Sequence, residues 1–114
     1  MPGDRIAKVN ALITTELGQL MKRLVEFPLG TIVTISKVDT AVDLSVTRVW
    51  ISVLPIEQVE AVEKILSQQR GELQHYLNRK LVMKFVPHIE FHIDYTEEKA
   101  FRVESLLDDI AEKE

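Results

Sequence analysis

Apolar residues recur at spacings of three and four along the first part of the chain, within residues 5–26. The members of this stripe are Ile6, Val9, Ile13, Leu17, Leu20 and Leu24. The spacing predicts an amphipathic helix. We expect Asp4 to be its N-cap, since a carboxylate there can accept a backbone N–H of the first turn. The sequence Phe27-Pro28-Leu29-Gly30 then predicts a turn that ends the helix.

Two segments with strand character follow. Residues 31–38 are rich in β-branched side chains, and residues 44–54 alternate between two faces. One face of the second segment carries Thr47, Val49, Ile51 and Val53, and the other carries Val46, Arg48, Trp50 and Ser52. Because only the polar residues 39–43 separate the two segments, we expect antiparallel neighbouring strands.

The next pattern is helical and then changes to strand alternation. Residues 56–69 and 73–79 both have helical periodicity, and we expect a break at Arg70-Gly71 to divide them into two helices. Residues 81–95 alternate between apolar and polar side chains and predict one long strand, with Pro87 marking an edge or a bulge.

A last helix is expected from Thr96 to about Ala111, with a strongly acidic solvent face. The predicted order is helix, strand, strand, helix, kink, helix, strand, helix. A three-stranded sheet with helices packed on one face buries every apolar stripe of this order. We therefore expect an α+β fold and a single domain over residues 1–114.

Charge is distributed unevenly along the chain. The 114 residues carry a net charge of −4. Residues 1–80 hold 10 Lys and Arg against 9 Asp and Glu, whereas residues 81–114 hold 4 against 9. An acidic chain is a poor match for nucleic acid, whose phosphates are bound by lysine and arginine. The distribution nevertheless allows a local basic patch in the first part of the chain.

The composition excludes several classes of protein. The chain has no cysteine, which excludes a disulfide scaffold, a cysteine nucleophile and thiolate metal sites. No apolar run approaches the ~18–20 residues of a membrane helix, and the N-terminal residues lack the order of a secretory signal. We expect a cytoplasmic protein without a membrane partner.

Candidate catalytic and metal-binding residues are few. The sequence has no glycine-rich phosphate loop and no residue set that indicates an enzyme. His88 and His92 lie four apart, but on a strand this separation is roughly 13 Å, whereas zinc lies about 2 Å from each ligand. We therefore expect no metal and a solvent-facing row of His88, Glu90 and His92.

Two features suit RNA. Trp50 shares a strand face with Arg48 and could stack on a base, although we favour the interpretation that another segment of the fold covers it. The break at Gln69-Arg70-Gly71 would let a backbone approach closely, and the helix after it would offer N–H groups to phosphate. A plain corner between two helices is the alternative, which the spacing alone favours.

Several motifs together resemble the ribosome-binding factor A family across nearly the whole chain. They are Arg5-Ile6-Ala7, Phe27-Pro28-Leu29-Gly30, Arg48-Val49-Trp50-Ile51, Val86-Pro87-His88-Ile89-Glu90-Phe91 and Asp94-Tyr95-Thr96. The resemblance implies a KH-like fold of the second type with an interrupted helix pair. The family's Ala-x-Gly kink corresponds to Gln69-Arg70-Gly71, which keeps the glycine and lacks the alanine.

The resemblance also implies a function. Members of the family are non-catalytic assembly factors that bind the small (30S) ribosomal subunit and its 16S rRNA and assist late maturation, including 5′-end processing. We expect no cofactor, no small-molecule substrate and a monomer. The expected RNA-binding residues are Lys64, Arg70, Gly71, Arg79 and Lys80 around the kink, extended by Arg5, Lys8, Lys22, Arg23, Lys37 and Arg48. The alternative is a KH-like protein-interaction module that meets a basic partner through its acidic C-terminal helix.

Overall fold

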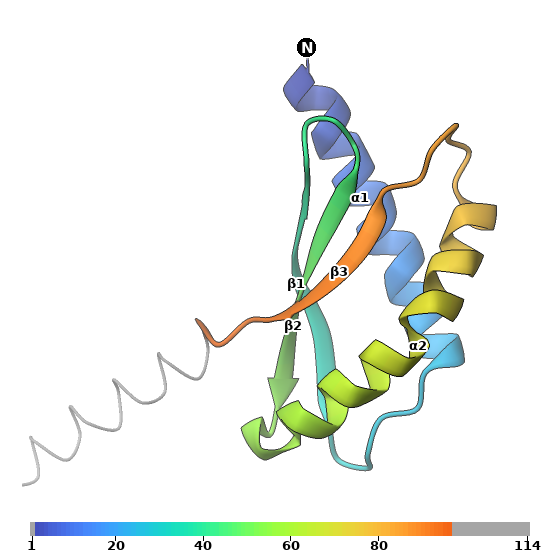
Figure 1. Ribbon diagram of the computed structural model, residues 1–114. Helices are drawn as coiled ribbons and strands as arrows, with labels where there is room; N and C mark the ends of the chain where they lie inside the picture. The colour runs from blue at the N-terminus through green and yellow to red at the C-terminus, as the bar shows by residue number, and fades with distance from the viewer. Residues whose placement is uncertain (1, 97–114) are drawn as a thin grey trace, which may run out of the picture.

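A computed structural model describes residues 2–96 of the chain (Figure 1). In order, its elements are α1 (Pro2–Leu24), β1 (Ile32–Thr40), β2 (Val46–Leu54), a short 3-10 turn (Ile56–Gln58), α2 (Val59–Lys80) and β3 (His88–Ile93). The helix expected from Thr96 to about Ala111 falls outside the described residues.

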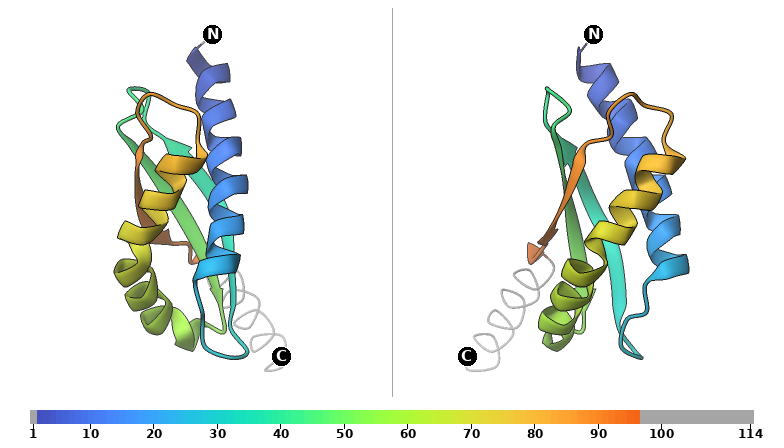
Figure 2. Two further views of the ribbon diagram at one scale, coloured as in Figure 1. Left: turned by 90° about the vertical axis from the view of Figure 1, so that its right-hand side faces the viewer. Right: turned by 45° about the vertical axis from the view of Figure 1, so that its right-hand side comes forward.

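The three strands form one sheet in the order β1-β2-β3. β1 is antiparallel to β2, as expected from the short connection, and β3 is parallel to β2. Figure 2 shows both helices on the same face of the sheet, and α1 and α2 run in opposite directions. The α+β fold with helices packed on one face is therefore confirmed.

The core lies between β2 and the two helices. Thr47, Val49, Ile51 and Val53 of β2 are at most 3% exposed, so the predicted core face of this strand is confirmed. The helical side chains that are essentially inaccessible are Ile13 and Leu17 of α1 and Val62, Leu66, Leu73 and Leu77 of α2. Removing this apolar surface from water is the main stabilising contribution to the fold.

Helix α1 begins earlier than expected and is followed by the predicted turn. Pro2 is its first residue, which places Asp4 within the first turn, so the expected N-cap was wrong. Proline suits this first position because its missing N–H would have no partner there. In the turn, Thr31 N donates to Pro28 O at 3.1 Å, and Gly30 has a φ of 79°, a conformation that glycine adopts without strain.

A β-bulge changes the phase of β1. Ile35 pairs with Ile51 but Lys37 pairs with Trp50, which leaves Ser36 as the extra residue. Before the bulge, Val33 and Ile35 face the core, and after it Val38 and Thr40 do, so the core-facing side changes from odd-numbered to even-numbered residues. It also lets the strand continue through Thr40, so the expected loop over residues 39–43 is instead a turn over residues 41–45.

A buried polar chain connects α1 to the sheet where β1 ends. Thr40 and Thr47 are only 4% and 0% exposed, and their hydroxyl oxygens lie 2.8 Å apart. Thr40 donates its single hydroxyl proton to Asn10 of α1, so Thr47 must donate to Thr40. These bonds satisfy hydroxyl groups that would otherwise be costly to bury.

Helix α2 is continuous, and the expected division into two helices was wrong. Residues 59–80 are helical through Arg70 and Gly71, although the ribbon bends along its length in Figure 1. Glycine costs about 1 kcal/mol within a helix. Leu66, Leu73 and Leu77 lie on one buried stripe that spans Gly71, and their packing outweighs that cost.

β3 is much shorter than the strand expected over residues 81–95. It begins at His88, which pairs with Val46, the first residue of β2. Residues before His88 therefore have no strand beside them. Gln74 of α2 fixes this beginning, because its Oε1 accepts from Ile89 N at 2.8 Å and its Nε2 donates to Pro87 O at 3.1 Å.

Candidate nucleic-acid interface

A groove runs between α2 and the free edge of β3. Within residues 2–96, the sheet order leaves this edge without a neighbouring strand. The groove has a volume of about 430 Å³, and its lining residues are Glu63, Leu66, Ser67 and Arg70 of α2 and Phe91, His92 and Ile93 of β3. Its walls combine apolar side chains with one arginine and one carboxylate, Glu63, so any attraction for a phosphate is local to the guanidinium of Arg70.

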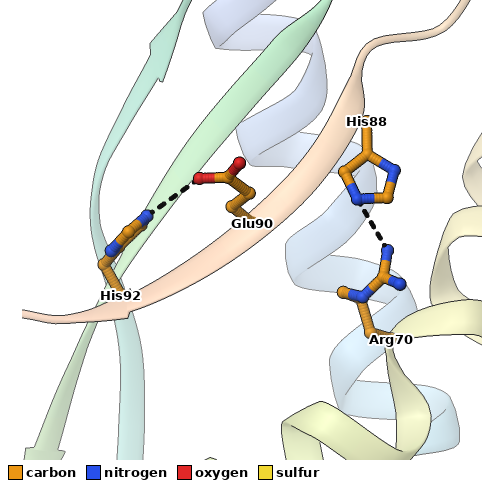
Figure 3. A network of polar contacts seen from close by, with 4 residues as sticks. All are labelled: Arg70, His88, Glu90 and His92. Atoms are coloured by element: carbon orange, nitrogen blue, oxygen red, sulfur yellow. Dashed lines mark hydrogen bonds and ion pairs between the residues drawn. The ribbon is translucent and has the colours of Figure 1, made fainter.

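Arg70 lies where α2 approaches the start of β3. Its guanidinium is 3.0 Å from Nε2 of His88, and Figure 3 shows this pair between the two elements. Arginine only donates, so the contact requires His88 Nε2 without a proton. A guanidinium has five N–H donors, and this contact uses one of them, which leaves donors for a phosphate in the groove.

The other cations of α2 do not lie beside Arg70. Arg79 follows Arg70 by nine residues, which is roughly 180° around a helix. Lys64, Gly71 and Arg79 therefore share the outer side of α2, where all three are exposed. The structure thus separates the expected cluster into a groove side with Arg70 and an outer side with Lys64, Gly71 and Arg79.

The cations of α1 lie near its two ends, and the antiparallel arrangement of the helices places only one of these pairs near cations of α2 (Figure 1). Arg5 and Lys8 lie at the end of the molecule where α2 finishes with Arg79 and Lys80. At the opposite end, a hollow of about 630 Å³ brings together Lys22, Arg23, Gln68 and Gln69. Cations separated by most of the length of α1 cannot contact the same phosphate.

Arg48 and Lys37 lie on the face of the sheet that no described helix covers. Arg48 is exposed, and its register partners are Asp39 of β1 and Glu90 of β3. Two carboxylates beside one arginine leave little net positive charge at this row. Arg48 and Lys37 are therefore separated from Arg70 by the sheet and its β3 edge.

Trp50 occupies the centre of this helix-free face. It is half-buried, and its ring centroid lies 5.0 Å from that of His92 with the planes tilted by 32°. The segment that partly covers Trp50 is thus the neighbouring strand β3. His92 in turn lies 3.2 Å from Glu90, so the expected solvent-facing row is partly occupied by internal contacts (Figure 3).

Two aspartates are held ionised by neighbouring hydroxyl and N–H donors. The hydroxyl and backbone N–H of Thr96 and the hydroxyl of Ser36 lower the pKa of Asp94. The hydroxyl and backbone N–H of Ser45 lower the pKa of Asp43 in the same way. Hydrogen bonds to a carboxylate favour its charged form.

Within residues 2–96, no three His, Cys, Asp or Glu side chains are grouped so as to hold a metal ion. None of the helices described in this part of the chain is long and apolar enough to cross a membrane.

The residues that line the groove beside Arg70 were not recognised from the sequence. A signal for them is present on α2, where Glu63, Ser67, Arg70 and Gln74 recur every three or four residues as a polar stripe beside the apolar one. The sequence pattern did not predict that β3 lines the groove, because β3 pairs in parallel with residues of β2 that lie more than 40 positions earlier in the chain.

Two helices on one face of this mixed sheet, with a groove at the free edge of β3, define a KH-like domain. The model of the Ribosome-binding factor A family matches residues 5–107, and the chain belongs to this family. Ribosome-binding factor A of Bdellovibrio bacteriovorus is 32% identical over 95% of this chain and 81% of its own. Ribosome-binding factor A of Akkermansia muciniphila is 33% identical, and the match covers 93% of this chain and 84% of that protein.

Solved structures agree with this assignment. The crystal structure of ribosome-binding factor A from Thermus thermophilus superposes with a TM-score of 0.67 at 25% identity, covering 77% of this chain and 93% of that one. A homology model of the Thermus thermophilus factor, fitted into the cryo-EM map of its 30S complex, has a TM-score of 0.64 at 26% identity. It covers 75% of this chain and 90% of that one.

Proposed function

We propose that this protein is a non-catalytic assembly factor that binds the small (30S) ribosomal subunit through its 16S rRNA and assists late maturation, including 5′-end processing of the pre-rRNA. The observation that carries the proposal is the shared fold with a family member fitted into the map of a 30S complex. In this proposal the protein acts as a cytoplasmic monomer and needs no cofactor or small-molecule substrate.

The groove between α2 and β3 is the centre of the proposed RNA site. Arg70 lines it and has donors to spare for phosphate. The full proposed set is Arg70, Lys64, Gly71, Arg79 and Lys80 of α2, Arg5, Lys8 and Arg23 of α1, and Arg48 of β2. Because these residues lie on several sides of the molecule, we infer that the rRNA contacts more than one side of the protein.

Gly71 has a distinct role in this proposal. It is exposed on α2, and a Cβ built there would meet nothing within 4 Å in the protein. The fold itself therefore does not require glycine at this position. The absence of a side chain lets an RNA backbone approach the outer side of α2 between Lys64 and Arg79.

Co-sedimentation tests the proposed function. The purified full chain is centrifuged with free small subunits, free large subunits and assembled ribosomes over a series of salt concentrations. We expect selective binding to free small subunits that weakens as salt rises, because phosphate contacts release counterions. Absence of any preference for small subunits at low salt would contradict the proposal.

The same experiment separates the alternative function. A protein-interaction module acting through the acidic residues near the C-terminus would recover ribosomal proteins and would not bind protein-free 16S rRNA. The proposed RNA-binding factor should bind protein-free rRNA, with an affinity that falls with salt.

A further inference from the structure

The helix-free face of the sheet carries an aromatic centre with polar neighbours. Trp50 lies on the middle strand, and its register partners are Lys37 on β1 and His92 on β3. Along β2 itself, the adjacent residues on this face are Arg48 and Ser52, because alternate residues of a strand share a face. Trp50 is half-buried here, whereas Val49 and Ile51 on either side of it in sequence are fully buried.

The charged side chains directly beside Trp50 are both cations. Its immediate neighbours include two cations, Lys37 and Arg48, both exposed, and no carboxylate. The carboxylates of this face lie one position further away. Asp39 is the register partner of Arg48 and offsets part of its charge, and the other two have partners of their own. Glu90 contacts His92 at 3.2 Å, and Asp94 accepts a hydrogen bond from Ser36 at 2.7 Å.

His92 connects this face to the groove that holds Arg70. It is both a lining residue of the groove between α2 and β3 and the stacking partner of Trp50. A strand of RNA lying in the groove can therefore continue around the free edge of β3, where no further strand of the described part of the chain blocks it. The path from Arg70 past His92 ends at the Trp50 ring.

We propose that an unpaired nucleobase of the bound RNA stacks on the indole of Trp50, with Lys37 and Arg48 contacting the flanking phosphates. The proposal rests on the proposed RNA-binding function and adds a base-stacking position on the opposite face from the helices. An aromatic ring with adjacent cations is the arrangement that holds single-stranded RNA without requiring a particular sequence. Double-stranded RNA has no free base face to offer and is excluded from this position.

Trp50 is the only tryptophan of the chain, so its fluorescence reports on this position alone. The full chain is titrated with an unstructured single-stranded RNA of about ten nucleotides, a length within the usual range of such sites. The matched control strand has the same backbone with abasic sites in place of all bases. We expect saturable quenching of Trp50 emission by the intact RNA and not by the abasic strand or by a blunt RNA duplex.

Variants measure how much the stacking contributes. Anisotropy of a labelled copy of the same RNA should show an affinity about 5- to 100-fold lower for Trp50→Leu, as expected for loss of one stacked base. Trp50→Phe keeps an aromatic ring and should retain most of the affinity. Thermal unfolding of each variant checks that it is folded, and the quenching of the wild-type chain tests the proposal if Trp50→Leu does not fold.

The outcomes separate this proposal from the proposed function. If the wild-type chain binds small subunits and Arg70→Glu weakens that binding, while RNA leaves Trp50 emission unchanged, base stacking on Trp50 is wrong and the proposed function stands. If the wild-type chain binds neither small subunits nor RNA, the proposed function itself is wrong. Quenching by ribosomal proteins but not by RNA would assign the helix-free face to a protein partner and overturn the stacking proposal.

Discussion

The two faces of β2 differ although they alternate along the same nine residues. One face, with Thr47, Val49, Ile51 and Val53, is almost completely buried against the helices. The other face, which includes Arg48 and Trp50, is accessible to solvent and pairs with polar residues of β1 and β3. The core face of β2 thus serves stability, whereas the proposed RNA contacts lie at the alternate positions of the same strand, and single substitutions should separate the two.

The largest expected effect is on the buried face. Ile51→Ala removes a fully inaccessible side chain and should lower the free energy of unfolding by about 2–5 kcal/mol, through lost burial and a cavity. Arg48→Ala on the opposite face should change it by less than about 0.5 kcal/mol. Urea unfolding of both variants measures the difference, and equal losses would contradict the division between the two faces.

The next effect concerns the attachment of β3 to α2. Gln74→Ala removes both hydrogen bonds to the backbone around the start of β3 and should cost about 1–3 kcal/mol of stability. Hydrogen exchange at the Ile89 amide should also become faster, because that N–H loses its acceptor. The matched control is Gln68→Ala, on the exposed side of the same helix. A similar cost for both variants would show that Gln74 does not fix β3.

A smaller effect separates the fold from the proposed RNA contact. Gly18 and Gly71 are both helical, and a Cβ at either position would meet nothing within 4 Å. Replacement of each by alanine should therefore stabilise the protein by about 0.5–1 kcal/mol. Only Gly71→Ala should weaken co-sedimentation with small subunits. Equal binding by both variants would remove Gly71 from the RNA site.

The smallest effect concerns pH at the end of β3. The pKa of Asp94 is lowered in the folded state by Thr96 and Ser36, so its ionised form stabilises the fold at pH values above the unfolded-state pKa of about 3.9. This contribution is lost as the pH falls through the lower folded-state pKa. Asp94→Asn should therefore unfold at a lower temperature than wild type at pH 7, and the gap should narrow below about pH 4. A gap that is constant between pH 7 and pH 3 would contradict this account.

Local periodicity was sufficient to predict the elements whose apolar residues keep one phase. The buried face of β2 and the stripe of α1 were both predicted correctly, because each buries a regular set of side chains. The phase of β1 changes between Ile35 and Val38, where the bulge at Ser36 lies. The predicted end of the strand at Val38 rested instead on the polar residues 39–43, of which Asp39 and Thr40 belong to β1.

The remaining errors have tertiary causes. Gly71 favours a break locally, but the packing of Leu66 and Leu73 on either side keeps α2 continuous. The alternation from residue 81 onward suits a strand, but β2 begins at Val46 and offers no partner before His88. The assembly of α1, α2 and the sheet determines which cations share one surface. Arg70 and Arg79 lie on opposite sides of α2 only because the helix is continuous between them, and the sequence predicted a break there.

The central claim is that the groove side of α2 contacts rRNA, and Arg70→Glu tests it most directly. The matched control is Lys84→Glu, which makes the same charge change at an exposed residue outside the proposed site. Both variants are compared with wild type by co-sedimentation with small subunits across a salt series and by thermal unfolding. We expect Arg70→Glu to remain folded, to bind about tenfold more weakly and to lower the salt slope by about one, while Lys84→Glu binds like wild type. Wild-type binding by folded Arg70→Glu, or an equal loss in Lys84→Glu, would contradict the claim.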